Sequence, residues 1–247
     1  MILLKLLHAA TISTAAIIAL GIILVIPTFI EPTKPNNALR IMLSFSIADS
    51  SNASAWCSGL SSVLKANAVA ATVFFTGKTA EQHPEAVKAF PANVDIGSQT
   101  YSYVNLTLIS NYDAQLEEVS KGKQAVDFAG KLSSRIFKAP HGSTDQNIYS
   151  LLSESGISAD FSYEKQYNLF LNGQFVKFEA TSYRGSDHTA DFYLSLPRTG
   201  KLTILNFDDT CSLLSIAELV ERLKGGGVEF VNASELAGFT LTERTRL

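Results

Sequence analysis

The sequence has few cysteines, few histidines and few charged side chains. Its 247 residues include two cysteines, one tryptophan and four histidines. Two cysteines exclude a disulfide-dense miniprotein and a four-cysteine zinc module. The net charge is -3, so no overall basic field attracts nucleic acid. Apolar residues make up 46% and charged residues 17%, which excludes a disordered chain and suffices for a packed core.

One long apolar run lies near the start of the chain. Ala9–Ile30 contains no charged residue and, as a helix, reaches roughly 33 Å, enough to cross a hydrocarbon core of about 30 Å. We therefore predict an N-terminal hydrophobic helix that anchors the chain to a membrane, within residues 1–37, and one domain over residues 38–247. A cleaved signal peptide is the alternative. In both cases the domain is membrane-anchored or secreted and faces the extracellular or cell-wall side.

Further along the chain, apolar runs of strand length alternate with segments of helical spacing. Strands are expected over residues 39–47, 69–75, 94–96, 135–138, 157–163, 202–207 and 228–231. Helices are expected around residues 56–64, 84–90, 116–130, 148–156 and 215–225. Ser215 and Glu218 form a capping-box pattern at the start of the last helix. Residues 164–199 are polar and weakly patterned, and we expect one or two hairpins there.

The alternation predicts a fold with a parallel sheet. About seven β/α repeats in roughly 210 residues favour a distorted (β/α) barrel of about seven strands, with an open doubly wound sheet as the alternative. In both folds the chemistry belongs at the carboxyl ends of the strands. Cys57 and Cys211 fall near that face, and the sequence leaves open whether they form a disulfide or remain free. Sequons at Asn52, Asn105 and Asn232 are compatible with export.

Three segments at the expected strand ends carry a family pattern. Residues 95–107 are the most specific, residues 70–77 hold a strand and its glycine turn, and residues 137–142 read Phe-Lys-Ala-Pro-His-Gly. Over about residues 39–239 the chain resembles the polysaccharide deacetylases of carbohydrate esterase family four, which include chitin deacetylases. The resemblance implies that an N-acetylated, chitin-like polysaccharide is the partner. It also implies a zinc ion held by one aspartate and two histidines, a second aspartate as base and a histidine as acid.

The reactive positions of that pattern are changed in this chain. By the resemblance, the three metal-ligand positions hold Ile47, Gln99 and Tyr103. The positions of the base, of the arginine that orients it and of the acid hold Ser46, Lys138 and Phe207. Isoleucine cannot ligate, an amide is a poor zinc ligand, and a phenol with a reference pKa of about 10 is mostly protonated at pH 7. We therefore expect no zinc or other cofactor there, and a pseudoenzyme.

Other residues at the same edge remain as candidates. Asp49, His141 and Asp208 each follow an expected strand, and a histidine beside carboxylates can act as a base or bind a metal. For substrate binding we predict Tyr101, Tyr103, Pro140, His141 and Tyr163.

Three functions remain open from the sequence. The first is an inactive deacetylase-fold protein that binds or organises N-acetylglucosamine polymers at the cell surface or wall. The second is an active carbohydrate N-deacetylase with an altered site. The third is a structural surface protein without a sugar site. Fold does not choose among them, because function resides in the site.

Overall fold

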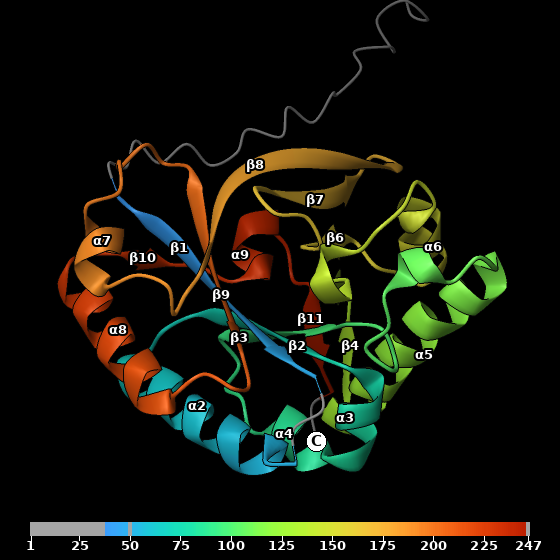
Figure 1. Ribbon diagram of the computed structural model, residues 1–247, viewed down its shortest axis with the longest axis horizontal. Helices are drawn as coiled ribbons and strands as arrows, with labels where there is room; N and C mark the ends of the chain where they lie inside the picture. The colour runs from blue at the N-terminus through green and yellow to red at the C-terminus, as the bar shows by residue number, and fades with distance from the viewer. Residues whose placement is uncertain (1–37, 49–50, 246–247) are drawn as a thin grey trace, which may run out of the picture. The chain divides into compact units, whose positions relative to one another are not determined.

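A ring of β-strands surrounded by helices forms the folded part of the chain (Figure 1). The computed structural model describes residues 38–48 and 51–245. The predicted N-terminal hydrophobic helix and Asp49 lie outside the described residues. Within the described ranges, no helix is both long and apolar enough to span a bilayer.

Eight strands of the described residues pair in a closed ring. In ring order they are β1 (Arg40–Ile47), β2 (Ala71–Phe75), β3 (Val94–Ser98), β5 (Ile136–Phe137), β6 (Ala159–Asp160), β7 (Gln166–Leu171), β8 (Gln174–Arg184) and β9 (Leu202–Asp208). β9 returns to β1 in parallel, with Arg40 opposite Leu202 and Ser46 opposite Asp208. This closure confirms the predicted distorted (β/α) barrel and excludes the open sheet. β10 (Glu229–Phe230) adds a short parallel pair beside the start of β1.

The polar stretch 164–199 supplies the two strands that complete the ring. β7 runs antiparallel to β6, and β8 runs antiparallel to β7 and then parallel to β9. The turn between β7 and β8 is Asn172-Gly173, with φ values of 52° and 84°. Two consecutive residues with positive φ are typical of a type I′ turn, whose twist matches that of the strands. One hairpin therefore forms here.

Helices cover the outside of the ring and close one end of it. They are α2 (Ala53–Asn67), α3 (Gly77–Gln82), α4 (Pro84–Lys88), α5 (Tyr112–Gly130), α6 (Ile148–Glu154), α7 (Ala190–Leu194), α8 (Leu213–Gly225) and α9 (Ala233–Ala237). Two 3₁₀ turns, η1 (Leu106–Leu108) and η2 (Pro140–Gly142), and a small antiparallel pair, β4 (Leu132–Ser134) with β11 (Thr242–Arg244), complete the fold.

Helix α8 begins earlier than the predicted capping box. The hydroxyl of Ser212 accepts a hydrogen bond from the backbone N–H of Ser215, so Ser212 is the N-cap and Ser215 lies in the first turn. A capping box does form at α9. The Asn232 side chain accepts from the N–H of Glu235, and the Glu235 carboxylate accepts from the N–H of Asn232. Asn232 is buried in this role, which argues against glycosylation at its sequon.

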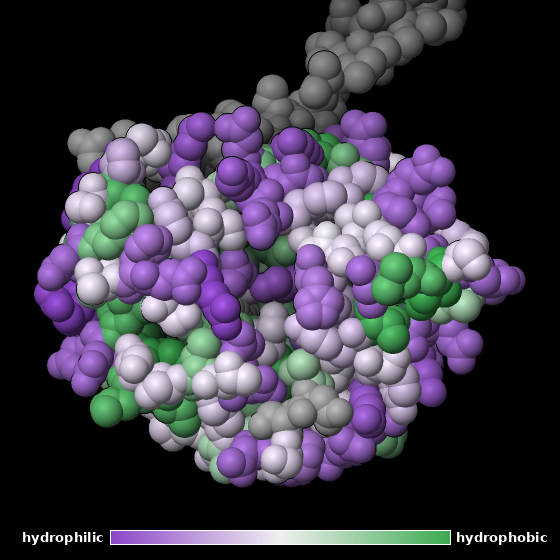
Figure 2. Space-filling model, in the orientation of Figure 1, coloured by the Kyte–Doolittle hydropathy of each residue, from purple (hydrophilic) through white to green (hydrophobic). Residues whose placement is uncertain are grey.

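The two faces of β1 serve two different cores. Its outward residues Leu43, Phe45 and Ile47 pack with Trp56 and Leu60 of α2. Complete burial of one such leucine contributes about 2 kcal/mol. The inward residue Met42 belongs to a second cluster, inside the barrel, with side chains of β2, β5, β6, β7 and β9. Residues of α9 belong to that inner cluster and close the end of the barrel where the parallel strands begin. On the face seen in Figure 2, hydrophilic side chains separate small apolar areas.

Alanine substitutions at two glycines, Gly173 in the turn and Gly225 in α8, test the conformation of the hairpin turn. An added Cβ would meet open space at both positions. They differ in backbone conformation, because only Gly173 has a positive φ. We expect Gly173→Ala to lower the free energy of unfolding by about 1 kcal/mol and Gly225→Ala, inside α8, to raise it by up to about 1 kcal/mol. Chemical denaturation measures both changes. Equal effects of the two substitutions would contradict the assigned turn.

Candidate functional site

The carboxyl ends of the parallel strands meet at the open end of the barrel, which we call the mouth and define by Ser46, Gln99, Lys138 and Asp208. Ser46 lies near the end of β1, opposite Phe74 of β2 on one side and Asp208 of β9 on the other. Gln99 directly follows β3, and Lys138 directly follows β5. The sheet register therefore brings Ser46, Gln99, Lys138 and Asp208 to the same end of the barrel.

Lys138 turns into the barrel and is held by neutral oxygens. Its Nζ donates to the hydroxyl of Ser44 at 3.0 Å and to Oδ1 of Asn206 at 2.7 Å. The amide of Asn206 in turn donates to the hydroxyl of Ser182 at 2.7 Å. The ammonium lies 5.5 Å from the centre of the Phe74 ring. Because burial removes water from a charge whose hydrogen-bond acceptors are neutral, the pKa of Lys138 is lowered to about 8.

The three positions that the resemblance assigns to metal ligands hold side chains that make other contacts. Ile47 is fully buried in the outer core. Gln99 is also buried, and its amide donates to the backbone carbonyl of Phe74 at 3.3 Å. Tyr103 is half-buried at the rim, with a positive φ of 62°. Burial, followed by the nearby charges of Asp208 and Asp209, raises the pKa of Tyr103, which keeps its phenol protonated near neutral pH.

These residues do not fit a zinc ion. An aliphatic chain, an amide engaged with the main chain and a protonated phenol offer no anionic or imidazole donor. Within residues 38–48 and 51–245, no three His, Cys, Asp or Glu side chains converge in a way that could hold a metal.

Tyr103 and His141 form an aromatic pair at the rim. Their ring centres are 5.0 Å apart and the planes are inclined by 67°, an edge-to-face contact. Both residues have positive φ, 62° and 56°. His141 is exposed, whereas Pro140 beside it is buried at the start of η2. The structure therefore brings two of the predicted binding residues into contact, with the imidazole facing solvent.

Asp208 has its carboxylate engaged by neighbours. Oδ1 accepts hydrogen bonds from the backbone N–H of Thr210, at 3.0 Å, and from the Thr210 hydroxyl. Oδ2 lies 3.3 Å from the guanidinium of Arg184 on β8. Burial favours the neutral acid, but the Thr210 hydrogen bonds and the Arg184 charge outweigh it and lower the pKa of Asp208. The position of Asp49, the other carboxylate of the alternative site, lies outside the described residues.

Other candidates lie at or near the rim with partners of their own. Phe207 is buried and stacks on Phe45, with ring centres 5.2 Å apart, in the outer core. Tyr101 donates its hydroxyl to Glu81 of α3, and the ammonium of Lys121 lies 3.8 Å from its ring centre. Tyr163 is half-buried. The predicted roles of these residues remain predictions.

Several polar residues that shape the mouth were not among the predicted site residues. Ser44, Ser182 and Asn206 form the hydrogen-bond network of Lys138, and Arg184 pairs with Asp208. One signal was available, since Ser44 is a polar residue in an apolar strand. The sequence around Ser182 and Arg184 of β8 gave no such indication, because the hairpin register determines where these residues lie in the ring. Cys57 and Cys211 are both free thiols.

The Lys138 network predicts a specific dependence of stability on pH. The unfolded chain holds the lysine proton up to about pH 10.5, whereas the folded chain releases it near pH 8. Stability therefore rises with pH between these values, by about 2 to 3 kcal/mol from this residue. We expect the stability of the wild type relative to Lys138→Met to rise by this amount in denaturation curves measured from pH 7.5 to 10.5. Other groups that titrate in this range, such as Cys57 with its pKa raised to about 12, affect both proteins alike. The exposed Lys88→Met on α4 is the control, and a difference between wild type and Lys138→Met that does not change with pH would refute the prediction.

A polysaccharide deacetylase family model matches residues 33–159, just over half of the chain. A search of curated proteins found no match.

Solved structures with the same fold include a family 4 carbohydrate esterase from Streptomyces lividans in complex with acetate. It is 21% identical, with a TM-score of 0.57 over 78% of this chain and 92% of that one. The peptidoglycan deacetylase PdaC from Bacillus subtilis is 16% identical, with a TM-score of 0.60 over 83% and 92%.

A family 4 pseudoenzyme from Bacillus anthracis is also 16% identical, with a TM-score of 0.58 over 81% of this chain and 66% of that one. At these identities the solved structures support only the fold, whereas the family model matches the sequence itself. By that match, and in agreement with its barrel, the chain belongs to the polysaccharide deacetylase family.

Proposed function

We propose that this protein is a polysaccharide deacetylase-family domain without the family's zinc chemistry, and that it binds N-acetylated glycan at the mouth. One observation carries the proposal: the three ligand positions hold Ile47 in the outer core, Gln99 bound to a backbone carbonyl, and the protonated phenol of Tyr103. The position of the acid, Phe207, is filled by an aromatic stack. The existence of a pseudoenzyme with this fold in Bacillus anthracis is consistent with such a loss.

Binding is assigned to the rim pair of Tyr103 and His141. Aromatic faces stack on the apolar faces of sugar rings, and the exposed imidazole of His141 offers hydrogen bonds to hydroxyl or acetamide groups. The predicted anchor at Ala9–Ile30 belongs to the same proposal, because it holds the barrel at the cell surface or wall, where such polymers lie.

An active enzyme with an altered site is the second candidate. The observation in its favour is that Tyr103 contacts His141 and also lies within the electrostatic reach of Asp208 and Asp209. Its weakness is the carboxylate of Asp208, since Thr210 and Arg184 already occupy both oxygens. Acetate release from acetylated chitooligosaccharides that disappears in both His141→Asn and Asp208→Asn would favour this candidate.

The proposal that the mouth holds no zinc is tested by metal analysis. After incubation with zinc and removal of the free ion, we expect less than about one-tenth of an equivalent to remain on the wild-type protein. The double variant Gln99→His, Tyr103→His introduces two imidazoles at these positions, and we expect it to retain more zinc than the wild-type chain. Stoichiometric zinc on the wild-type chain would overturn the proposal.

Glycan binding is tested by calorimetric titration with chitooligosaccharides. We expect weak saturable binding without acetate release, and a loss of about tenfold in affinity in Tyr103→Asn. Asparagine tolerates positive φ, so this substitution removes the ring without adding backbone strain. The matched control is Phe128→Ala on α5, because Phe128 is an aromatic residue 87% exposed outside the mouth. If no N-acetylated glycan binds, the third function, a structural domain without a sugar site, is the better description.

A further inference from the structure

A groove lies between helix α6 and the β7–β8 hairpin, on the flank of the barrel. Its volume is about 510 Å³, within the range of pockets that hold small ligands. Asp160 of β6 pairs with Asn168 of β7, so the antiparallel β7 carries the chain away from the mouth. The hairpin turn, which lines the groove, therefore lies toward the end of the barrel opposite the mouth. Tyr103 and His141 are not among the residues that line the groove, although Tyr149 also interacts with Tyr163, which follows β6.

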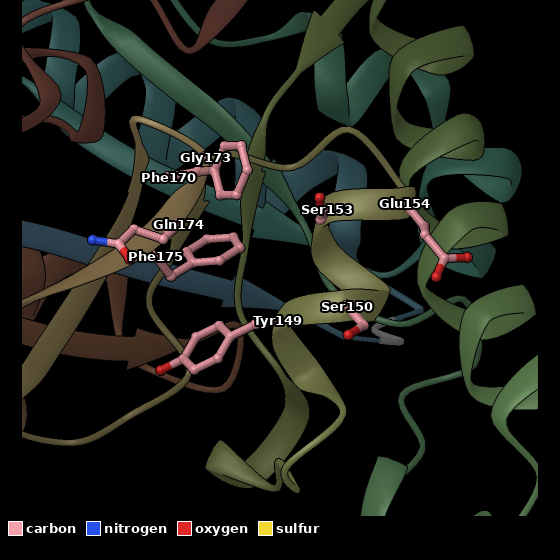
Figure 3. Close-up of a pocket in the computed structure, with 8 residues that line it drawn as sticks. All are labelled: Tyr149, Ser150, Ser153, Glu154, Phe170, Gly173, Gln174 and Phe175. Atoms are coloured by element: carbon pink, nitrogen blue, oxygen red, sulfur yellow. The ribbon is translucent and has the colours of Figure 1, made fainter.

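Three aromatic rings form one side of the groove. Figure 3 shows them in a row, with Phe170 and Phe175 from the hairpin and Tyr149 from α6. The centres of the Tyr149 and Phe175 rings are 4.9 Å apart with planes inclined by 25°, and those of Phe170 and Phe175 are 5.1 Å apart. Tyr149 is 37% exposed although it belongs to this stack. The rings therefore hold one another in place while part of their surface faces solvent.

The remaining lining is polar. Ser150 and Ser153 come from the exposed side of α6, and Gln174 comes from the first position of β8. Glu154 lies at the edge of the groove and accepts a hydrogen bond from the Tyr112 hydroxyl at 2.6 Å. Among the described residues that line the groove there is this one carboxylate and no cation.

The aromatic side of the groove and its polar lining together limit the class of ligand that fits. A phosphate or a sulfated chain would meet a carboxylate without a compensating cation, which disfavours anions. A purely apolar ligand would bury the hydroxyls and the amide without partners, which costs free energy. A pyranose ring satisfies both requirements, because it presents apolar C–H faces to aromatic rings and hydroxyls around its edge.

We propose that the groove of Tyr149, Phe170 and Phe175 is a second sugar-binding subsite, which takes uncharged pyranose units of a glycan on the flank of the barrel. The choice of an N-acetylated glycan as the natural ligand rests on the proposed function, whereas the groove itself does not. Two separate contacts on one polymer raise the overall affinity by avidity, so a weak mouth and a weak groove suffice to hold a chain.

The test observes the groove directly. The full-length protein is labelled with ¹³C-phenylalanine and titrated with N,N′-diacetylchitobiose and, separately, with cellobiose. We expect the Phe170 and Phe175 ring signals to shift saturably with at least one of the two sugars. Ser153→Lys introduces a long side chain at an exposed position of α6 that lines the groove, and we expect the variant to keep the fold. We expect it to weaken the binding seen at these signals by about tenfold, and Tyr149→Ala to do the same.

Two further variants separate this subsite from the mouth. Ser62→Lys makes the same change at an exposed position on α2 and is expected to leave the phenylalanine signals and their titration unchanged. Tyr103→Asn removes the ring at the mouth and is likewise expected to leave the groove titration intact, even if the mouth binds no glycan. Absence of any shift at Phe170 and Phe175 with both sugars, or a shift insensitive to Ser153→Lys, overturns the inference.

Discussion

The parallel pairing of β1 with β9 is the contact on which the rest of this structure depends. It extends from Arg40 opposite Leu202 to Ser46 opposite Asp208 and converts a curved sheet into a closed ring. Closure leaves β1 and β9 without a free edge between them, and it fixes which of their side chains point inward. Lys138 finds Ser44 and Asn206 together only because these two residues are neighbours in that register.

Packing and hydrogen bonds occupy the positions at which the family resemblance implies charged groups. That pattern implies carboxylates and histidines at this end of the barrel, and each such charge would require a partner or a metal. Here Ile47 and Phe207 extend the outer core, and Gln99 satisfies a backbone carbonyl. The buried cation Lys138 is accommodated by neutral hydrogen-bond acceptors and by a lowered pKa. These four side chains are therefore all accommodated, either by packing in the outer core or by hydrogen bonds.

Aromatic residues are distributed over two regions with different geometry. At the mouth, Tyr103 and His141 meet edge to face on backbone with positive φ. On the flank, Tyr149 and Phe175 stack nearly parallel across the gap between α6 and the hairpin. The inner aromatic stack of Phe161, Tyr167 and Phe178 packs the side chains of β7 and β8 against the residue that follows β6. Both regions therefore rest on strands whose positions the ring determines.

The sequence by itself determined the alternation of strands and helices outside residues 164–199 and favoured the barrel. These features are local, because they follow from periodicity and from the turn residues between elements. The prediction that residues 47, 99 and 103 hold no zinc came instead from the family resemblance and from the chemistry of single side chains. Only the tertiary structure decided that residues 166–184 complete the ring, that Arg184 pairs with Asp208, and that Tyr149 meets Phe175. Each of these contacts joins elements through ring closure or hairpin register, and a single sequence carries no local signal for pairings made across that distance.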